Sequence, residues 1–477
     1  MKNLFLAAAL LPCTIFAQGS LTPPGPPAPT MKTLAQIEPR TPISSLPFTI
    51  NQSGSYYLTT NLTGVSGQSG IIVQAGNVTI DLNGFELVGV AGASNGIFSA
   101  LSSSLTNLVV RNGTIRNWPG HGLAGAPRGH GRYEALRVLG NGSIGIFSGV
   151  ASIVADCNFD GNAPAISLES GSIVRNCVIR RSRGEGIRVG YGSSVIDCVI
   201  EESASNGVFT DESCTVRGCT VSLSGIAGID AGPGNIVEDS SSGYNGDVGI
   251  IAGEGSTIKN STAFANALEG IVAFNGVTIE SCSARLNEAG GIFAGRDATV
   301  LSCTVSTNTG HGILGTTNVI VKNTVVTRST RNGIQLDDNS TVVHCVSSQN
   351  RSNGIDVAVG CTVTDNTANQ NLQNGIVVNA RCRVAGNTAN ENGSFNVSGA
   401  GFWVVGDDNY IERNNAVHNF RGYLIDGGFN LIIQNKASDF PTGGAGFTVN
   451  NAADNREGPI VQDPASANTS PWANFAY

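Results

Sequence analysis

Two pairs of aspartates share one spacing in this sequence. Asp211 precedes Asp230 by 19 residues, and Asp337 precedes Asp356 by the same interval. Acid–base cleavage of a glycosidic bond uses two carboxyl groups that lie about 5 to 9.5 Å apart. Arg188 stands near the first pair and could serve a lyase-like reaction there. The first catalytic hypothesis is therefore Asp211 and Asp230 with Arg188, provided that the fold brings them together.

Asp338 adds one more carboxylate to the second pair. Oxygen ligands of this kind suit Ca²⁺, so Asp337, Asp338 and Asp356 form a candidate calcium site. Solvated surface carboxylates are the alternative account of both pairs. The choice depends on the elements that carry these residues.

Those elements belong to a repeat. Ten glycines, called the anchor glycines below, stand 21 residues apart in nine consecutive steps, and an apolar residue follows each one: Gly186, Gly207, Gly228, Gly249, Gly270, Gly291, Gly312, Gly333, Gly354 and Gly375. The series continues, with small insertions, through Ala165, Gly145, Gly122 and Gly96 on one side and Gly401, Gly422 and Gly446 on the other. A fixed period of about 20 residues is typical of a solenoid.

Two further columns of the repeat distinguish strands from helices. Twelve residues before the anchors runs an unbroken ladder of β-branched residues: Val174, Val195, Val216, Val237, Ile258, Ile279, Val300, Val321, Val342 and Val363. Such side chains fit pleated strands and disfavour helices. Four residues before several anchors stands an asparagine: Asn141, Asn245, Asn266, Asn287, Asn308, Asn350 and Asn371. We expect these asparagines at turns, where they tolerate left-handed backbone and can hydrogen-bond in a stack, so that each coil holds about three short strands.

With this repeat the chain resembles the right-handed parallel β-helix superfamily, which includes pectate lyases and polygalacturonases. The resemblance covers roughly residues 70–450 and implies an all-β solenoid of about 21-residue coils. It also implies that substrate would lie along one outward strand face. We expect an N-terminal β cap and a C-terminal capping tail, because an open end would expose a sheet edge. The fold alone does not assign a function.

Strand alternation predicts an outward column on this fold. Residues one and three after each anchor are regularly apolar and should point inward, so the residue between them should point outward. The outward column reads Phe98, Phe147, Arg188, Phe209, Asp230, Ile251, Val272, Phe293, Leu314, Gln335, Asp356, Val377, Trp403 and Leu424. One interpretation is a groove for an extended glycan, bound by Phe209, Phe293, Gln335, Asp356 and Trp403. The other is that the terminal segments or a second chain cover the column.

The same register predicts the geometry of the aspartate pairs. Asp211 lies four residues after its anchor and Asp230 two after the next, so strand rise and rung spacing predict a separation of ~8 Å. Asp337 and Asp356 repeat this arrangement. Asp230 and Asp356 are six coils apart, nearly 30 Å at ~4.8 Å per rung, and cannot cooperate in one reaction.

The cysteines follow the repeat as well. Ten of the eleven cysteines fall into two columns of the repeat. Members of the first column stand nine residues before an anchor, or eight in one shortened coil: Cys157, Cys177, Cys198, Cys219, Cys282, Cys303 and Cys345. Members of the second column stand seven residues after an anchor: Cys214, Cys361 and Cys382. Neighbouring rungs hold Cβ atoms about 5 Å apart, too far for a relaxed disulfide. We expect buried, stacked free thiols, and no metal site among them.

Charge excludes one class of partner. The chain has 27 basic and 35 acidic residues, a net charge of −8 and no polybasic run, so nucleic-acid binding is not expected. The one basic cluster comprises Arg175, Arg180, Arg181, Arg183 and Arg188. It could attract an acidic polysaccharide such as a uronate, but Glu201 and Glu202, one coil after Arg180 and Arg181, favour a surface salt-bridge ladder.

A Gly-His-Gly tripeptide occurs at 120–122, 129–131 and 310–312. A similar tripeptide carries an active-site histidine in polygalacturonases, but the Asn-Thr-Asp and Arg-Ile-Lys motifs of that family are missing here. We therefore assign His311 to a turn and do not transfer the activity. Insertions at 118–134 and 391–400 interrupt the period and form loops, which are common places for sites.

The predicted organisation is a signal peptide at 1–17, a proline-rich linker at 18–45, capping strands and first coils at 46–95, repeats at 96–450 and a capping tail at 451–477. No later stretch is apolar enough, over ~18 residues, to span a membrane. The resulting hypothesis is an exported monomer that binds, and could cleave, an extracellular polysaccharide or cell-surface glycan. A non-catalytic surface or adhesion rod and a calcium-assisted polysaccharide lyase are the alternatives.

Overall fold

A computed structural model describes residues 37–99, 106–125, 129–393, 398–450, 454–463 and 470–477. The chain divides into two compact units, Met1–Thr41 and Pro42–Tyr477. In the first unit Arg40 forms an ion pair with Glu38 (2.7 Å), and β1 (Thr41–Ile43) begins at its last residue. The predicted signal peptide and the proline-rich linker before residue 37 lie outside the described residues. Within the described ranges, no helix is long and apolar enough to cross a membrane.

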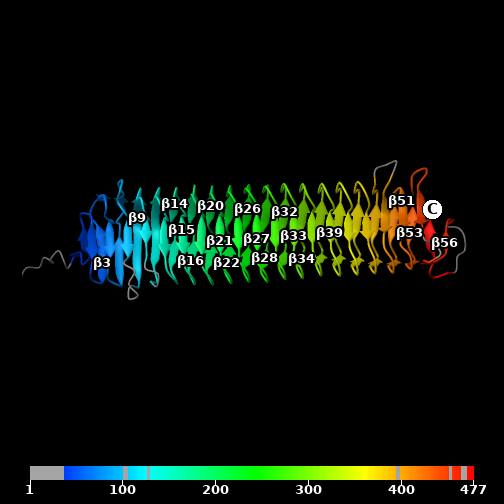
Figure 1. Cartoon of the computed structure of the whole chain (residues 1–477), viewed down its shortest axis with the longest axis horizontal. Coiled ribbons are helices and arrows are strands. Elements are labelled where there is room, and N and C mark those ends of the chain that lie inside the picture. Colours follow the sequence, from blue (N-terminus) through cyan, green and yellow to red (C-terminus); the bar gives the residue numbers. More distant parts are fainter. Residues whose placement is uncertain (1–36, 100–105, 126–128, 394–397, 451–453, 464–469) are drawn as a thin grey trace, which may run out of the picture. The chain divides into compact units, whose positions relative to one another are not determined.

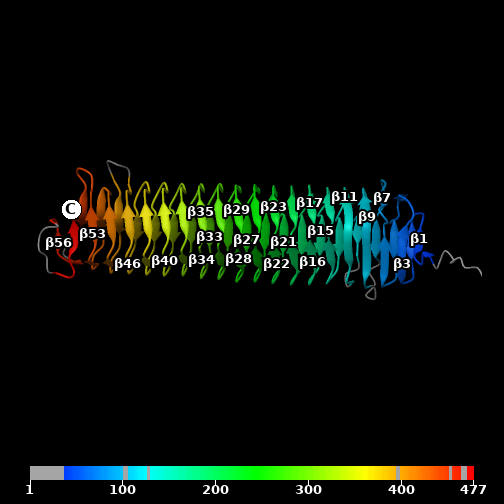
Figure 2. The same ribbon diagram turned by 180° about the vertical axis from the view of Figure 1, so that it is seen from behind.

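The second unit is a stack of coils whose strands form three parallel faces (Figures 1 and 2). Face 1 follows the anchor glycines and contains β2 (Phe48–Ile50), β5 (Ile71–Val73), β8 (Ile97–Ser99), β10 (Leu123–Ala124), β12 (Ile146–Ser148), β15 (Ile166–Leu168), β18 (Ile187–Val189), β21 (Val208–Thr210), β24 (Ile229–Ala231), β27 (Ile250–Ala252), β30 (Ile271–Ala273), β33 (Ile292–Ala294), β36 (Ile313–Gly315), β39 (Ile334–Leu336), β42 (Ile355–Val357), β45 (Ile376–Val378), β48 (Ala400–Val404), β51 (Arg421–Ile425) and β54 (Ala445–Val449).

Faces 2 and 3 complete each coil. Face 2 contains β3 (Gly54–Leu58), β6 (Val78–Asp81), β13 (Ile153–Ala155), β16 (Ile173–Arg175), β19 (Ser194–Ile196), β22 (Thr215–Arg217), β25 (Ile236–Glu238), β28 (Thr257–Lys259), β31 (Thr278–Glu280), β34 (Thr299–Leu301), β37 (Ile320–Lys322), β40 (Thr341–Val343), β43 (Thr362–Thr364), β46 (Arg383–Ala385), β49 (Tyr410–Glu412), β52 (Leu431–Ile433) and β55 (Arg456–Glu457). Face 3 contains β4 (Leu62–Thr63), β7 (Glu86–Val88), β14 (Asn158–Asp160), β17 (Val178–Arg180), β20 (Val199–Glu201), β23 (Thr220–Ser222), β26 (Ser241–Gly243), β29 (Thr262–Phe264), β32 (Ser283–Arg285), β35 (Thr304–Ser306), β38 (Val325–Thr327), β41 (Val346–Ser348), β44 (Thr367–Asn369), β47 (Thr388–Asn390), β50 (Asn415–Val417), β53 (Lys436–Ser438) and β57 (Asn474–Ala476). The longer β9 (Leu108–Arg116) and β11 (Arg132–Leu139) run through both faces.

Alternation along the strands builds the interior. In β21, β24 and β33 the first and third residues are buried while the middle residue is partly exposed. The β-branched ladder of face 2 is buried from Val174 to Val363, each member at 0% exposure. Burying one such side chain contributes about 1.5–3 kcal/mol, so the ladder supplies much of the core. The predicted all-β solenoid with coils of about 21 residues is confirmed.

The anchor column needs glycine because the backbones of consecutive coils approach each other closely there. At every anchor from Gly186 to Gly422, an added Cβ would lie 2.5–2.9 Å from a carbonyl oxygen of the next anchor glycine. The oxygen cannot retreat, since it accepts the ladder hydrogen bond of its neighbour; Gly333 O, for example, accepts from Ile313 N (2.8 Å). The period seen in the sequence therefore marks close backbone contact between coils.

The asparagines four residues before the anchors form a buried ladder, as predicted. The Asn287 side-chain amide donates to Asn308 Oδ1 (2.9 Å), and Asn287 Oδ1 accepts from both the side chain (2.9 Å) and the backbone (3.1 Å) of Asn266. The expectation of left-handed backbone at these asparagines is wrong. The residue before each one adopts it instead, as at Ala265 (φ 53°) and Leu286 (φ 59°). The asparagine can then direct its side chain along the stack.

Replacing Asn287 by alanine is expected to destabilise the protein by about 2–4 kcal/mol. The substitution leaves the buried backbone N–H of Asn266 without its acceptor and removes one hydrogen bond each from the Asn266 side-chain amide and from Asn308 Oδ1, and an unsatisfied buried group costs about 1–3 kcal/mol. Chemical denaturation would measure the change. Asn275→Ala, at an exposed position whose side chain accepts one bond from Arg296 N (3.2 Å), is the matched control and should cost about 0.5 kcal/mol or less. Equal losses in the two variants would contradict a stabilising ladder.

The ten described cysteines are buried free thiols, as predicted. Side chains in the first cysteine column also act as hydrogen-bond acceptors. The cysteines, and the serine, threonine or asparagine that takes their place in other coils, accept a backbone N–H of the preceding coil. Ser240 Oγ accepts from Cys219 N (3.2 Å), and Asn366 Oδ1 accepts from Cys345 N (2.8 Å). The column therefore takes small residues whose side chains can accept a hydrogen bond.

The C-terminal tail adds strands to the end of the stack. Strand β57 pairs with β53, β56 (Ile460–Val461) pairs with β57, and β55 pairs with β52. The described part of the tail thus continues faces 2 and 3 beyond the last coil, which confirms the capping tail. It does not lie along face 1.

Candidate functional site

The outward column of face 1 is a partly buried stripe. Most of its members, including Phe209, Asp230, Phe293, Gln335 and Trp403, are neither fully exposed nor buried. Arg188 is exposed and Val377 is buried. Neighbouring members lie side by side in register, and polar side chains at Arg188, Asp230, Gln335 and Asp356 interrupt longer apolar runs along the stack.

A hollow of about 400 Å³ opens where face 1 meets the turn that follows it, and is called the Asp230 hollow here. Its lining residues are Tyr191, Phe209, Thr210, Asp211, Glu212, Asp230, Gly232 and Pro233. The predicted pair Asp211 and Asp230 therefore shares one cavity, next to the ring of Phe209. Gly232 lies against Asp211 of the preceding coil, where an added Cβ would be only 2.9 Å from the Asp211 carbonyl carbon, so the two coils pack closely at this edge of the hollow.

The two carboxyl groups of this hollow lie in different environments. Burial raises the pKa of Asp230 above its usual value, although a hydrogen bond from Asn206 Nδ2 (3.0 Å) acts in the opposite direction. Asp211 is exposed to solvent. A buried carboxyl group with a raised pKa beside a solvent-exposed one is the kind of difference in environment that separates the acid from the base in acid–base catalysis.

Arg188 does not line this hollow. Its guanidinium lies over the ring of Phe209 (4.6 Å from Cζ to the centroid) and forms an ion pair with Glu185 (3.5 Å). Phe209 separates it from Asp230 along the column. Arg188 therefore fixes the aromatic wall of the hollow, a position from which it can contact a ligand that extends along face 1.

A second hollow repeats the first six coils later. This Asp356 hollow, of about 280 Å³, is lined by Gln335, Leu336, Asp337, Asp356, Val357, Ala358, Val377, Asn379 and Val405. Gln335, Asp337 and Asp356 stand 126 residues after Phe209, Asp211 and Asp230. The supporting amide is repeated too, since Asn332 Nδ2 donates to Asp356 Oδ2 (3.1 Å), and Asn353 adds a second bond (2.9 Å). Burial raises the pKa of Asp356 against these two bonds.

The three residues proposed for calcium do not gather around one point. No group of three His, Cys, Asp or Glu side chains suited to a metal ion occurs among the described residues. Asp337 and Asp356 line the hollow, whereas Asp338 accepts the backbone N–H of Val359 (3.0 Å). The second pair is thus arranged as a two-carboxyl site.

Trp403 lies further along the outward column. Its indole N–H donates to Asp426 in the next coil (2.7 Å), so the ring is held by a neighbouring side chain. Val377 and Leu424 flank it in register. The indole thus continues the stripe beyond the Asp356 hollow.

A third hollow, the Gly290 hollow, involves residues that sequence reasoning assigned to a turn. It measures about 460 Å³ and is lined by Glu269, Glu288, Ala289, Gly290, Ile292, Phe293, Thr309, Gly310, His311, Leu314 and Arg331. Glu269, Gly290 and His311 occupy one column, immediately before their anchors, so glycine leaves a gap between the two larger side chains. In the sequence, the signal for this hollow is a glycine between two larger polar residues in the column immediately before the anchors.

His311 has an unusual environment in this hollow. Its buried Nδ1 has no hydrogen-bond partner within the described ranges. Burial, together with the nearby Arg331 guanidinium, lowers the pKa of the imidazole. His311 is therefore neutral at neutral pH, and its imidazole forms part of the wall of the hollow beside Phe293.

The basic cluster is internally neutralised. Its arginines are held as follows: Arg175 by Asp156 (3.9 Å), Arg180 by Glu201 (3.2 Å), Arg181 by Asp160, Arg188 by Glu185 (3.5 Å) and Arg183 by the backbone carbonyl of Asn141 (2.6 Å). The salt-bridge ladder is confirmed, with one difference. Arg181 bonds to Asp160 of the preceding coil, while Glu202 of the next coil acts on it only through longer-range attraction.

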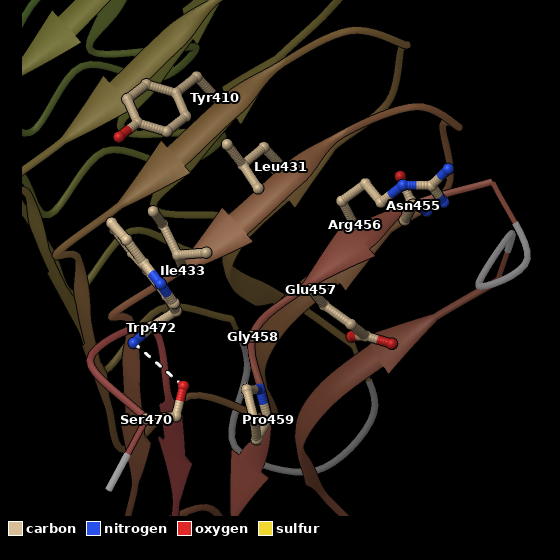
Figure 3. A pocket seen from close by; sticks show the side chains of 10 residues that line it. All are labelled: Tyr410, Leu431, Ile433, Asn455, Arg456, Glu457, Gly458, Pro459, Ser470 and Trp472. Carbon is tan, nitrogen blue, oxygen red and sulfur yellow. Dashed lines mark hydrogen bonds between the residues drawn. The ribbon is translucent and has the colours of Figure 1, made fainter.

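A further hollow of about 640 Å³ lies at the C-terminal end, on face 2 (Figure 3). It is lined by Tyr410, Leu431, Ile433, Asn455, Arg456, Glu457, Gly458, Pro459, Ser470 and Trp472. In Figure 3 the Trp472 ring lies beside Ile433, and the backbone N–H of Trp472 donates to Ser470 Oγ (3.3 Å). This hollow forms where the tail meets the last coils, and it is separate from the stripe of face 1.

Comparison with known proteins defines the family. The model of the right handed beta helix region matches residues 48–238, 192–318, 232–364 and 294–392, which together exceed half of the chain. A comparison with the curated proteins finds no match.

Several solved structures match this chain at low sequence identity and low TM-score. The Azotobacter vinelandii mannuronan C-5 epimerase AlgE4 A-module is 12% identical over 84% of this chain and 90% of that chain, with a TM-score of 0.32. The Dettilon tailspike protein is 14% identical over 64% and 62% (TM-score 0.36), and the catalytic domain of a GH87 α-1,3-glucanase is 11% identical over 77% and 68% (TM-score 0.33). The function of this chain therefore rests on its own residues.

Proposed function

This chain belongs to the right-handed β-helix family, and on that premise we propose that it is an exported protein that binds an extended polysaccharide along face 1. The observation that carries the proposal is the stripe itself, a row of apolar and polar side chains with three hollows along it. Sugar rings present apolar faces and hydroxyl edges, which match aromatic walls and carboxylate or amide groups. The signal peptide predicted at 1–17 from the sequence supports export.

The repeat gives the binding surface its extent. Phe209 and Phe293 are four coils apart, about 19 Å at ~4.8 Å per rung, and Gln335 lies two coils beyond Phe293. A ligand that reaches all three hollows is therefore a chain of sugars rather than one sugar. The stripe is straight along the stack, because every coil places its column residue in register with the next.

The Asp230 hollow supports a second candidate function, cleavage of the bound chain. Two carboxyl groups share a cavity, and burial of one of them raises its pKa. The ~8 Å predicted between them by strand rise and rung spacing fits inverting hydrolysis, which leaves room for a water molecule.

Removing the Phe209 ring tests the binding proposal. We expect Phe209→Ala to weaken binding about tenfold, which corresponds to 1.4 kcal/mol, because the ring forms one wall of the Asp230 hollow. The measurement is affinity electrophoresis of the full chain on a panel of soluble polysaccharides, with pull-down on insoluble ones.

Tyr244→Ala is the matched control. Tyr244 is an exposed aromatic residue that directly follows strand β26 of face 3, outside face 1, so its loss should leave glycan binding unchanged. Circular dichroism of both variants would establish that they fold. If no polysaccharide binds the wild type, the proposal fails and the adhesion alternative is favoured.

A further inference from the structure

The charges along face 1 restrict the kind of glycan. Resting on the proposed function, we infer that the polysaccharide bound by face 1 carries free amines, as a polymer of hexosamines does, and is not a polyuronate. The inference uses the lining of the three hollows, the pairing of the basic cluster and the repetition of the aspartate site.

The two equivalent hollows are acidic. Asp211, Glu212 and Asp230 line the first, and Asp337 and Asp356 line the second; among the described residues that line them there is no lysine, arginine or histidine. A protonated amine in either hollow would form charge-assisted hydrogen bonds to carboxylates. A uronate carboxylate placed there would lie beside the exposed Asp211 and Glu212, or beside the exposed Asp337, with no cation among the described lining residues to offset the repulsion.

The Gly290 hollow fits the same ligand. Two carboxylates, Glu269 and Glu288, line it against one guanidinium, that of Arg331. His311 and Arg331 line the same hollow, next to Phe293. Hydroxyl groups of the sugar can bond to Arg331 while an amine meets the carboxylates.

The basic cluster does not supply a compensating anion site. Each of its arginines already bonds to a carboxylate or a backbone carbonyl, as described above. A polyuronate would have to displace these partners. The whole chain carries a net charge of −8, which further disfavours association with a polyanion.

Repetition of the acidic hollow explains why the ligand is a polymer. The Asp230 and Asp356 hollows are six coils apart, about 29 Å at ~4.8 Å per rung. A single amine sugar could occupy only one of them, whereas a long chain bearing an amine on every residue could engage both. Engagement of the second site is then intramolecular and strengthens binding.

The experiment compares three ligands of equal chain length: a β-1,4-linked glucosamine oligomer, its fully N-acetylated counterpart and an oligogalacturonate. Binding to the full chain is measured by calorimetry at about pH 6, where most carboxylates are ionised. We expect the amine oligomer to bind at least tenfold more tightly than the acetylated one. The preference should shrink as salt rises, because screening weakens ion pairing at exposed sites.

Two substitutions assign the preference to face 1. Glu212→Gln and Glu288→Gln each remove one negative charge from a hollow without changing its shape, and each should lower the ratio of amine to acetylated affinity about threefold. Glu238→Gln removes a charge from face 2 and should leave the ratio unchanged.

The outcomes separate the two proposals. Equal affinity for the amine and acetylated oligomers, or preference for the oligogalacturonate, would overturn the charge inference while leaving glycan binding along face 1 intact. A ratio that falls equally in Glu238→Gln would also overturn it. Absence of binding to these three ligands and to the whole polysaccharide panel would overturn the proposed function itself.

Discussion

Gly312→Ala is expected to destabilise the protein by about 3 kcal/mol or more, although it adds one methyl group. The new Cβ would lie 2.5 Å from Gly333 O and 2.2 Å from Val326 Cγ1. The first contact is with backbone that is fixed by the inter-coil ladder, and the second is with a fully buried side chain. Neither can move without breaking hydrogen bonds or core packing, and overpacking of this kind costs about 1–3 kcal/mol for each strained contact.

Gly290→Ala is the matched control for this prediction. Its added Cβ would meet His311 O at 3.4 Å and Glu269 Cγ at 3.6 Å, which are ordinary contacts. Chemical denaturation followed by circular dichroism would compare the two variants, with attention to partial unfolding, since a stack of coils can lose cooperativity. Equal stability of the two would show that the close approach of coils does not explain the anchor column.

Asp230→Asn is expected to lower the rate of glycan cleavage about 10²–10⁴-fold, the usual contribution of a general acid. The amide keeps the size of the side chain and can still bond to Asn206, so the hollow should keep its shape. Asp211→Asn should have a comparable effect, because it removes the base that activates water. Reducing-end release on the polysaccharide that binds most tightly would measure the rates.

The pH profile gives an independent readout. Asp230 must be protonated to act as the acid, and burial raises its pKa, so activity should persist above the usual range of an aspartate and fall as pH rises through the raised value. Asp239 is an exposed aspartate that directly follows strand β25 of face 2. Asp239→Asn should therefore change neither the cleavage rate nor its pH profile. If Asp230→Asn cleaves as fast as the wild type, other residues carry out the reaction. If the wild type binds a polysaccharide without cleaving it, the protein is a binding protein and the cleavage proposal fails.

Much of the fold and part of the site were predictable from residue spacing. Gly186 to Gly375 set the coil length, and the ladder from Val174 to Val363 identified strands, because both patterns repeat without interruption. Register then placed Asp211 beside Asp230, and the structure confirms that they share a cavity. The Gly290 hollow was missed, since His311 was judged by the average content of its column and not by its immediate neighbours.

The sequence by itself determined the period, the face on which each residue lies and which residues are neighbours in adjacent coils, because parallel stacking in register converts spacing into position. Only the tertiary structure decided which outward positions are concave, that burial raises the pKa of Asp230, and that Arg181 pairs with Asp160. These properties depend on the volume and charge of several side chains around one point. Periodicity gives their order along the stack but not the space between them.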